Sequence, residues 1–130
     1  MSDEFASLTG LIPEIERGQR EGWRAADSRR NSSVGYGPVA GAFVHAIYAL
    51  IEAKPQYDLH NYHAILERKG VFKSGASVWV YDAAQLDIQG VLALLALAYR
   101  ADYHQGGGLV AELCENGTLL KWLQRLKELA

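Results

Sequence analysis

The chain has 130 residues, of which 49% are hydrophobic, and a formal net charge of −2 at pH 7. This length suits one globular domain over residues 1–130, and the small net charge excludes binding to nucleic acid or anionic lipid through an overall basic field. The single cysteine, Cys114, cannot form an internal disulfide, and the acidic N-terminus lacks the apolar core of a signal peptide. Together these features favour a cytoplasmic protein.

The N-terminal stretch 3–16 carries apolar residues at helical spacing. Phe5, Leu8, Ile12 and Ile15 predict one or two short packed helices, and Pro13 marks a break or the first turn of a new helix.

The segment 17–37 is rich in arginine and ends in a loop of serine, asparagine and glycine residues. Its candidate interaction residues are Arg17, Arg20, Trp23, Arg24, Arg29 and Arg30. In a helix, Arg17, Arg20 and Arg24 would share one face, which could meet phosphates or an acidic protein surface. A solvated basic face that balances acidic residues elsewhere explains the same pattern equally well.

The middle of the chain predicts two further helices. Pro38 opens the first, which ends at Lys54, and the second runs through 61–69 with Asp58 or Asn61 as its cap. Residues 71–81 then have a β-type composition at Val78–Tyr81, so a short β-hairpin and an extended apolar connector both remain open.

The stretch 86–103 is the predicted centre of the fold. Its apolar run from Val91 to Tyr99 is far shorter than the roughly 20 residues that cross a bilayer, so it predicts a buried helix, with Asp87 as the N-cap. The glycines of 106–108 end this segment, a short helix follows in 109–117 and is closed by the Asn116-Gly117 stop, and a last helix begins with Thr118 as its cap. We therefore expect a mostly α, compact, single-domain helical bundle around the helix at 86–103.

One pattern of residues runs through the second part of the chain: Asp87, Leu94, Leu95, Arg100, Ala101, Asp102, Gly107, Leu109, Glu115, Gly117, Leu123, Arg125 and Leu126. By these positions the chain resembles the bacterial domain of unknown function 6508 family, over roughly residues 36–126. Where the family has R-A-D-R-F-x-E-G-H, this chain has glycine in place of the glutamate and the histidine, at Gly106 and Gly108. The resemblance implies a helical fold and a bacterial or phage origin, but no reaction.

A cluster of polar residues, Arg100, Asp102, Tyr103 and His104, lies at the end of the central helix. With the amides of the following glycines it could frame an anion or ligand site, or even an enzymatic one. The interpretation that we favour is structural: Arg100 and Asp102 tie the helix end to the next segment, and the glycines permit the turn.

Other candidate chemistry is weak. His60, His63 and Glu67 share a helical face but lack a fourth ligand, so we predict no metal site, and Cys114 in an apolar stripe suits a small core residue. No catalytic motif is recognisable, and we expect no cofactor.

These features favour a non-enzymatic protein that acts by binding another protein, and an inhibitor of a bacterial complex carried by a phage or mobile element is a narrower form of this hypothesis. The alternatives are a nucleic-acid binder that uses Arg17–Arg30 and a small-ligand or enzymatic site at Arg100–Gly108. Self-association is compatible with all three.

Overall fold

The computed structural model describes residues 5–23, 36–73 and 77–130. In these ranges the chain forms α-helices and short 3-10 helices, with no strand, so the expected mostly α fold is confirmed. The same residues contain no helix with both the length and the apolar character that crossing a membrane requires.

The N-terminal stretch forms two short helices, as its spacing predicts. Helix α1 spans Ala6–Thr9 and α2 spans Ile12–Glu21, with Pro13 in the first turn, where a missing N–H costs nothing. Phe5, Leu8, Ile12 and Ile15 are all buried. Gly22 adopts a left-handed conformation (φ 72°) and ends α2.

Helix α3 (Gly37–Ala53) begins with Pro38 in its first turn and leads through two 3-10 turns, η2 (Pro55–Tyr57) and η3 (Leu59–Asn61), into α4 (Tyr62–Arg68). The expectation that the side chain of Asp58 or Asn61 caps α4 is wrong. Asn61 occupies the N-cap position, but its amide donates to Asp58 Oδ1 (2.9 Å) and neither side chain caps the helix.

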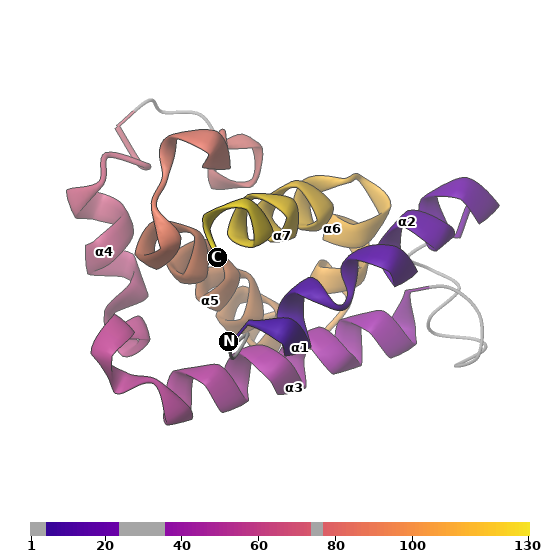
Figure 1. Ribbon diagram of the computed structural model, residues 1–130, viewed down its shortest axis with the longest axis horizontal. Helices are drawn as coiled ribbons and strands as arrows, with labels where there is room; N and C mark the ends of the chain where they lie inside the picture. The colour runs from indigo at the N-terminus through magenta and orange to yellow at the C-terminus, as the bar shows by residue number, and fades with distance from the viewer. Residues whose placement is uncertain (1–4, 24–35, 74–76) are drawn as a thin grey trace.

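Helix α5 (Ile88–His104) lies in the middle of the molecule, where α3, α4, α6 (Leu109–Glu115) and α7 (Thr118–Leu129) pack against it (Figure 1). Its residues from Gly90 to Ala96 are all buried, so neighbours cover every side of that stretch. The N-cap prediction is confirmed, because Asp87 Oδ1 accepts from the Gly90 amide (2.9 Å).

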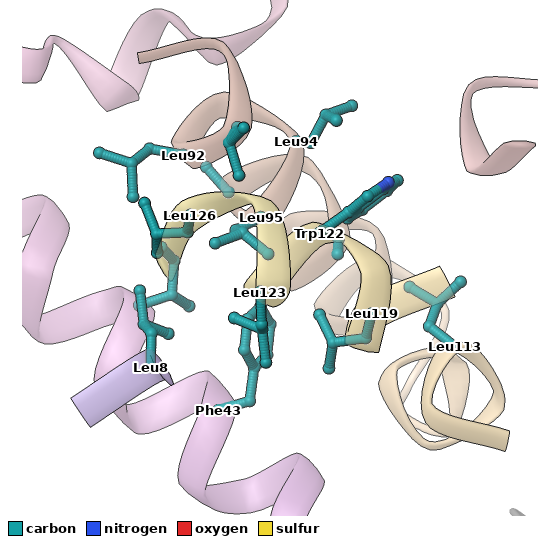
Figure 2. Packing of buried hydrophobic residues seen from close by; sticks show 14 of the residues in the cluster. Leu8, Phe43, Leu92, Leu94, Leu95, Leu113, Leu119, Trp122, Leu123 and Leu126 are labelled. Atoms are coloured by element: carbon teal, nitrogen blue, oxygen red, sulfur yellow. The ribbon is translucent and has the colours of Figure 1, made fainter. Parts of the chain in front are cut away.

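The core is one continuous apolar cluster that joins these helices. Figure 2 shows Leu95 of α5 near Leu123 and Leu126 of α7, while Leu8 and Phe43 approach from α1 and α3. Burial of this apolar surface is the main term that favours the folded chain.

The hairpin expected as one option for 71–81 is not formed in the described residues of that stretch. Instead η4 (Val78–Val80) and η5 (Ala83–Gln85) are single 3-10 turns, and we call residues 77–87 the strap. Ser77 Oγ accepts from the Trp79 amide (3.2 Å) and Asp82 Oδ1 from the Ala84 amide (3.0 Å), so local side chains close turns where a strand would need a partner.

The strap is attached to α7 by side chains. Thr118 Oγ1 donates to the Trp79 carbonyl (3.3 Å), and the Arg125 guanidinium donates to the Leu86 carbonyl (3.1 and 3.3 Å). The expectation that Thr118 caps α7 is therefore wrong: Gly117, with φ 87°, is the N-cap residue, and the Thr118 hydroxyl binds the strap.

Candidate functional site

Arg17, in the described part of the Arg-rich segment, is already paired. Arg17 forms ion pairs with Glu14 (3.1 Å) and Glu21 (4.0 Å) and lies over the Trp23 ring, 5.1 Å from its centroid. Trp23 Nε1 in turn donates to Glu21 Oε1 (3.0 Å). Arg17 and Trp23 thus contribute to a local network at the end of α2.

Of the three arginines predicted to share a helical face, Arg17 and Arg20 lie on α2, which ends at Glu21. Arg20 is exposed on α2. Arg24, Arg29 and Arg30 lie outside the described residues. The sequence missed this end because Gly22 was not recognised as a left-handed stop.

The polar cluster at the end of α5 divides into parts with different surroundings. Asp102 Oδ1 accepts from the Val110 amide (3.1 Å) and so ties α5 to α6. The Gly106 amide donates to the Tyr103 carbonyl (3.2 Å) and the Gly107 amide to the Asp102 carbonyl (2.9 Å). These two amides close the turn and are not free donors for an anion.

Arg100 faces a different part of the surface. It is exposed, and it makes no hydrogen bond or ion pair with any residue that the structure describes. It lines a pocket of about 130 Å³ between the C-terminal parts of α3 and α5 and the turn at η3. We call this the tyrosine pocket; its lining residues are Tyr48, Ile51, Glu52, Leu59, His60, Tyr62, Tyr99 and Arg100.

The walls and floor of the tyrosine pocket differ in chemistry. Ile51 and Leu59 are buried and give it an apolar floor. The rings of Tyr48 and Tyr99 meet edge to face, with centroids 6.2 Å apart at 71°. On the rim, Glu52 Oε2 lies 3.7 Å from His60 Nε2, a distance at which the pair is ionic when the histidine is protonated.

An exposed aromatic surface surrounds this pocket. Tyr48 is 53% exposed and Tyr103 is 71% exposed, and Tyr103 lies one helical turn beyond Tyr99 on the same side of α5. The Tyr103 and His104 rings are also in edge contact (5.8 Å). We call Tyr48, Tyr99, Arg100, Tyr103 and His104 the tyrosine surface.

Sequence reasoning found only part of this surface. It singled out Arg100, Tyr103 and His104 from their density at one helix end, but it gave Tyr48 and Glu52 no role. Residues of three separate segments meet here, and no spacing along one helix records that. The one available signal was a tyrosine at the edge of an apolar stripe.

A second hollow, of about 570 Å³, lies between the strap and α7. Its walls include Trp79, Trp122 and Val80, which is 73% exposed. Arg125 is held here by the Leu86 carbonyl and by Glu128 (3.3 Å). Arg125 and Glu128, two charged residues of this hollow, therefore help to hold the strap.

Metal and thiol chemistry find no support in the described residues. No group of three His, Cys, Asp or Glu residues among them could hold a metal ion. The His63 ring stacks on Phe72 (4.9 Å), while His60 faces Glu52. Burial raises the pKa of the Cys114 thiol to about 12, so the thiol stays protonated and packs as a core residue.

Comparison with protein-family models, with curated proteins and with solved structures finds no match for this chain. The resemblance to the domain of unknown function 6508 family stays a prediction that rests on the residues quoted above.

Proposed function

We propose that this protein acts by binding another protein, and that the tyrosine surface makes the contact. One observation carries the proposal: two tyrosines are exposed, Tyr48 in edge contact with Tyr99 and Tyr103 one helical turn beyond Tyr99, and the Arg100 guanidinium has no partner among the described residues. Tyrosine and arginine are enriched in protein interfaces, where they supply much of the binding energy.

The tyrosine surface also has the layout of an interface centre. Its rings are supported from below, since Tyr48 leans on Tyr99 and Tyr99 packs against the core. Aromatic side chains held in this way lose little conformational entropy when a partner covers them. Glu52 and His60 add a polar rim, which would select the orientation of the partner.

The alternative of nucleic-acid binding is supported less by the described residues. Arg17 is paired with two glutamates, and α2 ends at Glu21, so that Arg17 and Arg20 are the arginines it carries. An enzymatic or anion site that uses the glycine amides of Arg100–Gly108 is likewise supported less, because the turn uses the amides of Gly106 and Gly107.

Affinity capture with surface variants tests the proposal. The tagged full chain is incubated with bacterial lysate, with and without nuclease and at low and high salt, beside Tyr48→Ala, Tyr103→Ala and Val80→Ala. Val80 is the matched control, because it is at least as exposed as either tyrosine but lies on the strap. We expect a stoichiometric protein partner whose affinity falls about thirtyfold in each tyrosine variant and is unchanged in Val80→Ala.

Two results would contradict the proposal. One is recovery of nucleic acid alone, lost at high salt, which would favour the Arg-rich segment. The other is a protein partner that is lost in Val80→Ala and kept in both tyrosine variants. Light scattering of the isolated protein shows whether the partner is a second copy, and the identity of a captured complex tests the narrower proposal of an inhibitor.

A further inference from the structure

The tyrosine pocket is small, and its size limits what it can hold. At about 130 Å³ it is below the roughly 300–1,000 Å³ of pockets for drug-sized ligands, which excludes a nucleotide or a dinucleotide. An apolar cavity of about 150 Å³ is known to hold one benzene molecule. The pocket therefore has room for about one six-membered ring.

The walls favour an aromatic ring over an aliphatic one. Tyr48, Tyr62 and Tyr99 surround the space, and Ile51 and Leu59 close its floor. The edge-to-face contact of Tyr48 and Tyr99 leaves aromatic edges and faces at the same site, where a third ring can pack in the same manner.

The charges favour an anion at one end of that ring. The Arg100 guanidinium has no partner in the described part of the chain, and its planar fork matches a carboxylate with two parallel hydrogen bonds. The one carboxylate of the pocket, Glu52, already faces His60. A second negative charge on the ligand would meet Glu52, so a single carboxylate fits and two do not.

We propose that the tyrosine pocket is a binding site for a small aromatic monocarboxylate, with the ring between the tyrosines and the carboxylate on Arg100. This site goes beyond the proposed protein contact, and Tyr103 separates the two: it belongs to the tyrosine surface but does not line the pocket. Tyr103→Ala should weaken the protein contact and leave the small ligand bound.

The test is a titration of the isotope-labelled full chain with sodium benzoate, followed by NMR. Benzamide and benzylammonium serve as neutral and cationic probes of the same size. We expect saturable shifts at residues 48–52, 59–62 and 99–100 with a dissociation constant of about 1 mM, a value that nine non-hydrogen atoms can reach. Benzamide and benzylammonium should bind at least about tenfold more weakly, because neither can accept two charge-assisted hydrogen bonds.

Variants of Arg100 then test whether its guanidinium binds the carboxylate. Arg100→Gln should weaken benzoate binding about tenfold and Arg100→Lys by less, while Arg68→Gln, an exposed arginine of α4 outside the pocket, should bind as the parent does. Arg100 is exposed, so these variants should keep the fold, and their thermal unfolding checks this. Absence of saturable shifts in the parent, equal binding of benzylammonium, or unchanged binding in Arg100→Gln would each overturn the proposal.

Discussion

Asp87 fixes the start of α5. The hydrogen bond from the Gly90 amide, together with the Lys69 ammonium 3.1 Å away, holds the pKa of the Asp87 carboxyl below its ordinary value of 3.8. A carboxylate at this position satisfies an N–H that the helix itself cannot and lies at the positive end of the helix dipole. The stabilisation therefore depends on the charged form.

Asp87→Ala should lower the free energy of unfolding by about 1 kcal/mol at pH 7. Because the folded pKa is depressed, this stabilisation is present above the unfolded pKa and is lost as the pH falls through the folded one. The difference between Asp87→Ala and the parent should thus shrink below pH 3.8, the ordinary value. Urea unfolding across this range measures it.

Asp87→Asn is the matched control, since its amide oxygen can still cap α5 but cannot titrate. The free energy of unfolding of Asp87→Asn at pH 7 should lie between those of the parent and Asp87→Ala. Residue 87 should contribute nothing to its pH dependence. Equal stability of Asp87→Ala and the parent at pH 7 would contradict a stabilising role for this cap.

Gly18, which has no side chain, lets two aromatic rings lie close against α2. A Cβ at Gly18 would lie 2.6 Å from Trp23 Cε3 and 2.6 Å from Tyr36 Cε1, and Tyr36 is buried. Gly41, on the exposed side of α3, has nothing within 4 Å of the same atom. The two glycines therefore respond differently to one methyl group.

Gly18→Ala should destabilise the protein by about 1–3 kcal/mol, because the rings of Trp23 and Tyr36 must move away from the added methyl group. Gly41→Ala should stabilise it by about 0.5–1 kcal/mol, the ordinary helix preference of alanine over glycine. Thermal or urea unfolding of the two variants measures both changes in stability. A Gly18→Ala protein as stable as Gly41→Ala would mean that α2 does not pack as described.

Elements could be predicted where one local signal dominated. The apolar run of α5, the proline in the first turn of α3 and the Asn116-Gly117 stop of α6 were confirmed on that basis. The strap could not be predicted, because Val78–Tyr81 has β-type residues but no partner strand, and contacts with α7 decide its shape. The caps of α4 and α7 failed for the same reason: distant or competing acceptors took their side chains.

At the scale of the molecule, α5 links the core to the surface. Its first half is covered on all sides, while its last turns carry Tyr99, Arg100 and Tyr103 toward α3 and solvent. The sequence indicated both the buried half and the polar end. It could not indicate the pocket, because Tyr48, His60 and Arg100 come together only when α3 and η3 pack beside α5.

The most direct measurement is hydrogen–deuterium exchange of the full chain with and without its captured partner. If the tyrosine surface is the contact, protection should be confined to residues 44–52 and 97–104, with residues 78–85 and α7 unchanged. Protection of the strap and α7 without any at the end of α5 would contradict a contact at the tyrosine surface.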